Sequence, residues 1–149
     1  MSVNSNKNSK QVSHYAFGTG TSSNIEQYIG DRVGYRIFLL DRYFQDKGLK
    51  DTLPIKKDDI LRFVDVTHEP KTTAIDKLIN DIKKEKNGTL PGVIIGIGGG
   101  STLDTAKAIA NLFTNPGKAE DYQGWDLVKY PGIFKIGVPT ISGTGAESS

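Results

Sequence analysis

A short apolar run that leads into three glycines and then into a helix constrains the fold of this chain more than any other stretch. Residues 93–97 are Val, Ile, Ile, Gly and Ile, so apolar side chains point to both faces of a strand. This pattern is typical of a strand that is buried on both sides in a parallel sheet. Gly98, Gly99 and Gly100 follow, where no side chain blocks a close approach to the backbone. We expect a sharp turn here and, at Gly99, a φ angle that only glycine tolerates easily.

The residues after the glycines predict the start of a helix. Ser101 is a good N-cap residue, and Asp104 stands three positions later, as in a capping box with Asp in place of Glu or Gln. A strand, a glycine turn and a helix N-terminus together present free N–H groups and the positive end of the helix dipole. The stretch therefore predicts a phosphate or pyrophosphate site. The alternative is a glycine turn that only forms the corner between a strand and a helix.

Segments with strand and helix patterns alternate along the rest of the chain. We expect further strands over residues 15–20, 34–41, 63–66 and 134–139. We expect helices over residues 22–29, 43–49, 72–86 and 101–113, with Ser22 or Ser23 and Thr72 or Thr73 as N-caps. This alternation predicts an α/β fold, in which helices flank a parallel, Rossmann-like sheet with right-handed crossovers.

Two of these helices have an apolar face at helical spacing. The members of the two faces are Ile75, Leu78, Ile79 and Ile82 in the first helix and Leu103, Ala106, Ala110 and Phe113 in the second. The small alanines of the second helix permit close packing on the sheet. We expect Asn87 and Gly88 to end the first helix.

Charge and cysteine content exclude several classes of function. The 149 residues carry 19 basic and 17 acidic side chains, a net charge of +2, which does not suggest a nucleic-acid partner. There is no cysteine for disulfides or thiolate metal sites, and no apolar run approaches the length that spans a membrane. Residues 1–13 are polar and lack the apolar core of a secretory signal. We expect a cytoplasmic protein with a disordered tail over residues 1–13 and one dinucleotide-binding domain over residues 14–149.

A second stretch of small and hydroxyl side chains follows the last expected strand. Residues 140–149 include the hydroxyl side chains Thr140, Ser142 and Thr144. Two glycines, Gly143 and Gly145, stand on either side of Thr144, and Glu147 follows. Beside a strand end, these hydroxyls suit a second wall for a polar ligand. The alternative is a surface loop without a ligand.

The two stretches together resemble the iron-containing, or group III, alcohol dehydrogenases. Residues 98–107 resemble the G-G-G-S-x-x-D-x-A-K motif of that family, and residues 139–147 resemble its P-T-T-x-G-T-G-S-E motif, with Ile141 in place of the second Thr. The resemblance covers residues 14–149 and corresponds to the N-terminal, cofactor-binding domain of the family. Residues 122–127 and 140–145 are most similar to its subgroup of 3-deoxy-D-manno-octulosonate 8-oxidases.

The resemblance implies that an NAD cofactor lies across one edge of the sheet. It implies cofactor contacts for the residues that match the family's pattern, namely Asp41, Gly98, Gly99, Gly100, Ser101, Asp104, Thr140, Ser142 and Thr144. The glycines and Ser101 would hold the pyrophosphate, and the hydroxyls would line its other side and the adenine. Asp41 would accept hydrogen bonds from the adenosine ribose, and its charge would repel the 2′-phosphate of NADP. Asp104 suits a helix cap better than a contact with substrate.

A metal site is expected outside these residues. Members of the family hold a divalent iron or zinc ion with one Asp and three His in a C-terminal helical domain. This chain has only His14 and His68, and neither has a partner at ligand spacing. We therefore predict no metal ligand and no catalytic residue within the chain, and we expect that it is truncated before the C-terminal helical metal-binding domain.

Three interpretations remain open from the sequence. The first is the cofactor-binding part of a metal-dependent alcohol dehydrogenase that transfers a hydride from an alcohol to NAD. The second is the oxidase subgroup, which acts on the terminal alcohol of a sugar acid. The third is a standalone nucleotide-binding module without catalysis. The first two imply a small-molecule alcohol or sugar-acid substrate, and the resemblance also implies a homodimer.

Overall fold

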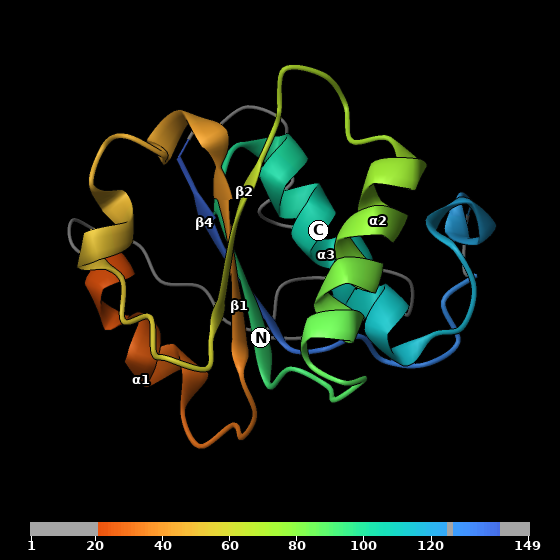
Figure 1. Cartoon of the computed structure of the whole chain (residues 1–149), viewed down its shortest axis with the longest axis horizontal. Helices are drawn as coiled ribbons and strands as arrows, with labels where there is room; N and C mark the ends of the chain where they lie inside the picture. The colour runs from red at the N-terminus through yellow and green to blue at the C-terminus, as the bar shows by residue number, and fades with distance from the viewer. Residues whose placement is uncertain (1–20, 125–126, 141–149) are drawn as a thin grey trace, which may run out of the picture.

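A parallel sheet of four strands forms the centre of the computed structural model, which describes residues 21–124 and 127–140. All neighbouring strands run parallel, in the order β2-β1-β3-β4. The strands are β1 (Arg36–Asp41), β2 (Ile60–Val64), β3 (Val93–Gly98) and β4 (Lys135–Pro139). Figure 1 shows α1 on one side of this sheet and α2 and α3 on the other. The predicted α/β fold is therefore confirmed, while the strand expected over residues 15–20 lies outside the described residues.

Three α-helices accompany the sheet in the described part of the chain. They are α1 (Ile25–Ile29), α2 (Thr72–Glu85) and α3 (Gly100–Thr114). Short 3-10 turns are found at η1 (Thr21–Asn24), η2 (Arg42–Phe44), η3 (Leu49–Thr52) and η4 (Ala119–Tyr122). None of the helices in the described ranges is long and apolar enough to cross a membrane.

Several predicted boundaries are wrong. The helix expected over residues 43–49 is replaced by the two turns η2 and η3, which flank Gly48 in a left-handed conformation with φ 71°. The strand expected over residues 63–66 begins earlier, at Ile60, because Ile60 and Leu61 pair with β1. The N-caps expected at Ser22 or Ser23 and at Thr72 or Thr73 are also wrong, since α1 and α2 follow Asn24 and Lys71 without a side-chain cap.

The end of α2 agrees with the prediction. Asn87 and Gly88 have φ angles of 52° and 74°, in the left-handed region where glycine and asparagine are the usual residues. The N–H of Gly88 donates to the carbonyl of Lys83 over 2.8 Å, which satisfies a carbonyl of the last helical turn. This turn directs the chain back to the amino end of β3.

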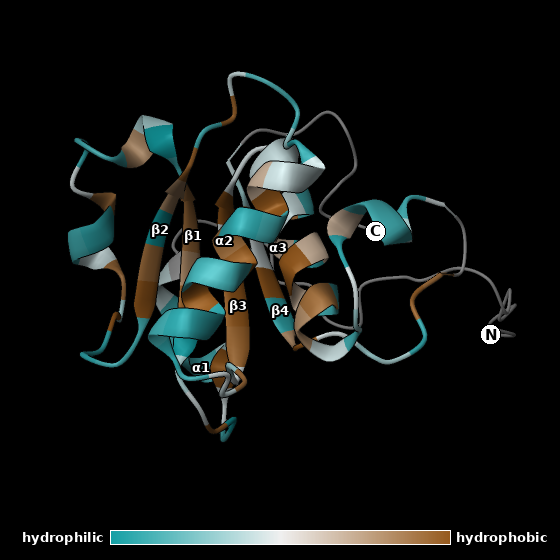
Figure 2. Ribbon diagram, turned by 45° about the vertical axis from the view of Figure 1, so that its right-hand side comes forward, coloured by the Kyte–Doolittle hydropathy of each residue, from teal (hydrophilic) through white to brown (hydrophobic). Residues whose placement is uncertain are grey.

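Each face of the sheet has its own apolar core, and Figure 2 shows the apolar strands behind α2, which is hydrophilic on its outer side. On one face, Ile75, Ile79 and Ile82 of α2 pack with α3, as the helical spacing predicted. The predicted face of α3 is buried with them, from Leu103 to Phe113. On the other face, α1 covers β1 and β3 through buried side chains, which are Ile25, Ile29, Phe38, Leu40, Val93, Ile95 and Ile97.

Helix α3 lies close to the sheet because the strands beneath it carry glycine. Gly96 of β3 and Gly137 of β4 are register partners. A Cβ on Gly96 would lie 3.0 Å from the Cβ of Ala106, and one on Gly137 would lie 3.4 Å from Leu103 Cδ2. Because larger side chains at these two positions would push the helix away, the glycines fix the height of α3 above the sheet.

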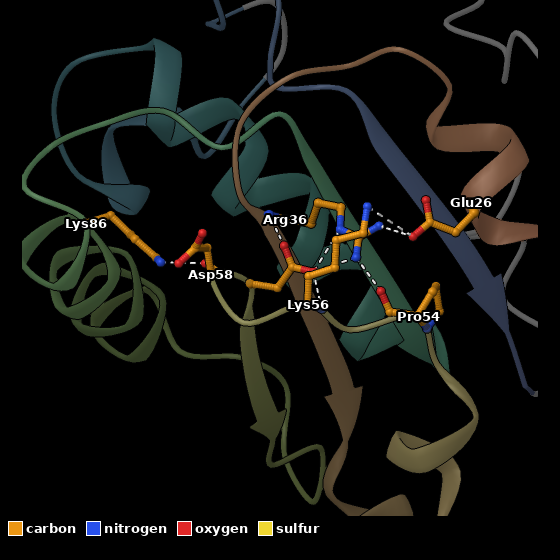
Figure 3. Close-up of polar contacts among 7 residues, drawn as sticks. Glu26, Arg36, Pro54, Lys56, Asp58 and Lys86 are labelled. Carbon is orange, nitrogen blue, oxygen red and sulfur yellow. Dashed lines mark hydrogen bonds and ion pairs between the residues drawn. The ribbon is translucent and has the colours of Figure 1, made fainter.

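A buried arginine joins the elements at the amino end of β1. Arg36 is 5% exposed and donates through Nε and from its backbone N–H to the carboxylate of Asp59, over 2.8 and 2.9 Å. Its guanidinium also donates to Glu26 of α1 over 2.6 Å and to the carbonyl of Pro54. Figure 3 shows Glu26 from α1 and Pro54 from the segment before β2 directed toward Arg36. The cluster connects three segments that are far apart in sequence.

The protonation of Asp59 adds a pH dependence to this cluster. Burial alone would raise the pKa of Asp59, but the hydrogen bonds from Arg36 and from the N–H of Lys56 outweigh it and hold the pKa below its ordinary value. A carboxyl group of this kind stabilises the fold at neutral pH. Its contribution is lost as the pH falls through the lowered pKa of the folded state.

We predict that Asp59→Ala destabilises the domain by about 3–5 kcal/mol at pH 7, because it leaves a buried guanidinium with too few partners. Urea denaturation at pH 7 measures this change. Asp81→Ala is the matched control, since it removes an exposed ion pair with Lys77 and should leave the urea midpoint nearly unchanged. Equal midpoints for the two variants would show that the buried cluster does not stabilise the fold.

Candidate functional site

The carboxyl ends of β1 and β3 meet at a switch in the direction of the chain. From β1 the chain continues to β2 on one side, and from β3 it continues through α3 to β4 on the other side. In open α/β sheets, ligands bind in the crevice outside the carboxyl ends of the strands at such a point. Asp41 ends β1 and Gly98 ends β3, so two of the predicted site residues lie at this switch.

The glycine turn leaves open space above the start of α3. Among the residues that the structure describes, none would place an atom within 4 Å of a Cβ on Gly99, apart from its two neighbours in the chain. Gly99 has φ −82° and ψ −171°, an extended conformation that most residues adopt, so the predicted requirement for a glycine φ at this position is wrong. The lack of a side chain at Gly99 leaves this side of the backbone uncovered by the other described residues.

The N-terminus of α3 has no side-chain cap. The helix begins at Gly100 with Gly99 as N-cap, so the N-cap predicted at Ser101 is wrong. Because Gly99 is extended, the helix starts one residue earlier than expected, and Ser101 is already helical: its carbonyl accepts from Thr105 Oγ1. The first N–H groups of a helix have no partner within it. Such N–H groups, together with the positive end of the helix dipole, suit an anion.

Asp104 does not take part in a capping box. Its side chain is 62% exposed and pairs with Lys107 over 3.6 Å, one turn further along α3. The capping role predicted for Asp104 is therefore wrong, because the earlier start of α3 moves this residue beyond the first turn. Its carboxylate lies at the outer side of the helix.

Asp41 presents a half-buried carboxylate beside the glycine turn. Its Oδ1 accepts the backbone N–H of Tyr43 over 2.9 Å and so caps the turn η2. Within the described residues, Oδ2 accepts no hydrogen bond and remains open to a ligand. A Cβ on Gly98 would lie 3.0 Å from the Cβ of Asp41, which shows how closely the ends of β1 and β3 approach.

Thr140 follows β4 and lies at the same edge of the sheet. Its backbone N–H donates to the carbonyl of Gly98 over 2.9 Å, so the chain after β4 is joined to the glycine turn. The side chain of Thr140 is exposed. Ser142 and Thr144, which were predicted to line the same site, lie outside the described residues.

One buried hydroxyl at this edge was missed from the sequence. Thr102 Oγ1 is the only buried side-chain polar atom without a hydrogen-bond partner in residues 21–124 and 127–140. It lies 2.7 Å from the position that a Cβ would take on Gly98. A threonine two residues beyond a glycine turn carries no sequence signal of its own, because its burial depends on how α3 packs against β3.

Metal-ligand groups are absent from the part of the chain that the structure describes. Among these residues, no three His, Cys, Asp or Glu side chains lie together as metal ligands do. His68 is exposed in the segment between β2 and α2, while His14 lies outside the described ranges.

Residues 13–149 match the profile of the iron-containing alcohol dehydrogenases, and the chain belongs to this family. The resemblance of the two motifs is thereby confirmed at the level of the family. The chain is 34% identical over 91 residues to the NAD-dependent methanol dehydrogenase of Bacillus methanolicus, a stretch that covers 61% of this chain and 23% of that protein. It is 53% identical over 55 residues to the sulfoacetaldehyde reductase of Bilophila wadsworthia, covering 37% of this chain and 14% of that protein.

Solved structures show the same fold. The alcohol dehydrogenase from Oenococcus oeni matches with a TM-score of 0.75 and 26% identity, over 93% of this chain and 37% of that one. The sulfoacetaldehyde reductase from Bifidobacterium kashiwanohense, solved in complex with NAD+, matches with a TM-score of 0.66 and 25% identity, over 87% of this chain and 35% of that one. The chain thus spans less than two fifths of the length of each of these proteins.

We predict that Gly98→Ala destabilises the domain by about 1–3 kcal/mol, because the added methyl group meets Thr102 and Asp41 within 2.7–3.0 Å. Gly99→Ala is the matched control: its methyl group enters open space at a permitted φ, so its stability should stay equal or rise by about 0.4–1 kcal/mol. Thermal melts and urea titrations of the two variants measure the difference. If both glycines tolerate alanine equally, the close approach of β1, β3 and α3 at Gly98 is refuted.

Proposed function

We propose that this chain is the cofactor-binding part of a metal-dependent alcohol dehydrogenase, which transfers a hydride from an alcohol to NAD. One observation carries the proposal: an uncapped helix N-terminus and open space at Gly99 lie beside the carboxylate of Asp41, at the switch between β1 and β3. A dinucleotide has two groups that match this arrangement, a pyrophosphate and a ribose with two hydroxyls. The edge therefore fits NAD through its own residues.

In this proposal the pyrophosphate binds to the backbone of the glycine turn. The N–H groups of Gly99, Gly100 and Ser101 neutralise its charge together with the dipole of α3. Gly98 contributes the close approach of the strand to the helix, and Asp104 stays at the rim of the site. Thr140, Ser142 and Thr144 line the opposite wall and donate hydroxyl hydrogen bonds to the cofactor.

Asp41 selects NAD in the same proposal. Its free Oδ2 accepts hydrogen bonds from the adenosine ribose, while Oδ1 stays bound to the N–H of Tyr43. A 2′-phosphate at this position would bring its negative charge next to the carboxylate, which is unfavourable. The relatives named above include an NAD-dependent enzyme and one bound to NAD+, which supports this choice.

The metal and the substrate alcohol belong to a further region of the protein in this proposal, because the described residues supply no metal ligands. A divalent iron or zinc ion would polarise the alcohol oxygen and lower its pKa, so that a hydride can leave the adjacent carbon. The domain's own task is to hold the nicotinamide end of NAD within reach. We therefore expect the 149-residue chain to bind NAD weakly without turning over an alcohol.

Two alternatives remain as proposals. The similarity of residues 122–127 and 140–145 to the 3-deoxy-D-manno-octulosonate 8-oxidases favours an enzyme that oxidises the terminal alcohol of a sugar acid. The relatives named above are dehydrogenases and reductases, so we place the dehydrogenase first. Oxygen consumption against NADH formation by the complete protein distinguishes the two. The third proposal, a nucleotide-binding module without catalysis, predicts neither oxygen consumption nor NADH formation. A homodimer is compatible with all three proposals.

Calorimetric titration with NAD tests the proposed function directly. We predict that the parent chain binds NAD and that Gly99→Val abolishes binding while the domain remains folded, because the isopropyl group fills the space that the pyrophosphate needs. Ser101→Ala is the matched control: it keeps the backbone N–H groups and should weaken binding only slightly. Circular dichroism verifies the fold of each variant. If the folded Gly99→Val variant binds NAD as tightly as the parent chain, the glycine turn only joins β3 to α3 and does not contact the cofactor.

We predict that Asp41→Ala weakens NAD binding and reduces the preference for NAD over NADP. The variant loses ribose hydrogen bonds to a charged group, which contribute about 1.5–3 kcal/mol, and it also removes the repulsion of a 2′-phosphate. Asp41→Asn separates binding from folding, since its amide oxygen still accepts the N–H of Tyr43. Titrations of each variant with both cofactors measure the ratio of affinities. An unchanged ratio would place the ribose away from Asp41.

A further inference from the structure

The strands β1 and β2 deliver a charged pair to the same edge of the sheet. Asp41 and Val64 are register partners, so the next residues, Arg42 and Asp65, leave the sheet side by side. Arg42 NH1 donates to Asp65 Oδ2 over 3.1 Å, and the side chains are 60% and 51% exposed. This pair therefore lies directly beside the carboxylate that we assign to the ribose.

Asp65 is a well-organised acceptor for this arginine. The backbone N–H of Thr67 donates to Asp65 Oδ1 over 3.1 Å, and the Thr67 hydroxyl donates to the same oxygen. These contacts leave Oδ2 for Arg42. The hydroxyl and the N–H of Thr67, followed by smaller effects of Arg42 and His68, hold the pKa of Asp65 below its ordinary value. Asp65 is therefore charged throughout the neutral pH range.

Arg42 has the chemistry that would reverse the selectivity of Asp41. An arginine close to the ribose-binding acid is the usual group that accommodates a 2′-phosphate, because its planar fork of N–H donors matches phosphate oxygens. In this chain the arginine follows the acid immediately, yet its guanidinium is directed to β2 by Asp65. The same edge thus holds the Asp41 carboxylate, which would repel a 2′-phosphate, and the Arg42 guanidinium, which would attract one but is paired with Asp65.

We propose that Asp65 is a positioning residue for cofactor selectivity, which acts by holding the Arg42 guanidinium away from the 2′ position of the adenosine ribose. The inference rests on the proposed function, since it requires that the ribose binds to Asp41. Exposed ion pairs are weak, and a phosphate competes with a carboxylate for the same donors. The gain in affinity for a 2′-phosphate is therefore limited. Release of Arg42 from Asp65 should strengthen phosphate binding about tenfold, which is the scale of one charge-assisted contact.

The test uses ADP-ribose and 2′-phospho-ADP-ribose as probes, with calorimetric titration of the 149-residue chain. These probes differ only at the 2′ position and do not need turnover. In an Asp41→Asn background, which removes the direct repulsion, we predict that Asp65→Asn increases affinity for 2′-phospho-ADP-ribose about tenfold. Affinity for ADP-ribose should stay within about twofold. Asp65→Glu should restore the weak phosphate binding, because it keeps an acceptor for Arg42.

Two further variants separate positioning from simple charge. With Arg42→Ala in the same background, Asp65→Asn should add nothing, since no guanidinium remains to be released. Asp81→Asn, which breaks an exposed pair on α2, controls for the loss of one negative charge at a distance from the site.

Each outcome decides the inference. An increase in phosphate affinity that persists without Arg42 would assign the effect to direct repulsion by Asp65 and overturn the positioning role. No increase on Asp65→Asn, in a chain that binds ADP-ribose normally, would overturn the inference and leave the proposed function intact. Failure of the folded parent chain to bind ADP-ribose or NAD would overturn the proposed function, and this inference with it.

Discussion

The contact between α3 and two glycines of the sheet determines the position of everything at the candidate site. Gly96 and Gly137 lie next to each other on β3 and β4, and the side chains of Ala106 and Leu103 in α3 pack against them. Small residues on both surfaces bring the helix axis close to the sheet. As a result, the N-terminus of α3 opens directly at the ends of the strands and not above them. A larger residue at either glycine would push α3 away from the sheet and so displace the proposed pyrophosphate site, although neither glycine is part of it.

Strand order then combines groups that are far apart in the sequence. Asp41 precedes Gly98 by two complete crossovers, which is the reverse of the order in the dinucleotide fold where the glycine loop comes first. The order β2-β1-β3-β4 makes these strands neighbours, so the acid and the glycine turn share one edge. Chain order alone would have separated them. The same arrangement places Arg42 and Asp65 beside this edge, so that the charges near the proposed ribose position follow two different strands.

The features that could be predicted from the sequence are those encoded in a short stretch. The apolar run of β3, the glycine turn and the inward face of α3 are local patterns, and the structure confirms them. The N-cap predicted at Ser101 was wrong because α3 already begins at Gly100, directly after the extended Gly99. Arg36 and Asp59 are 23 residues apart, and their pairing depends on the register of β1 and β2, which no periodicity reveals. The burial of Thr102 could not be predicted either, because it depends on how α3 packs against β3.

The cluster around Arg36 lies at the amino ends of the strands, opposite the edge where Asp41 and the glycine turn meet. The buried charge cluster and the proposed cofactor site thus lie at opposite ends of one sheet. Residues at the recognition end can change without touching the buried charges that connect α1, β1 and the segment before β2. Substitutions after β1 and β2 could therefore alter the proposed cofactor preference while the buried cluster around Arg36 stays intact.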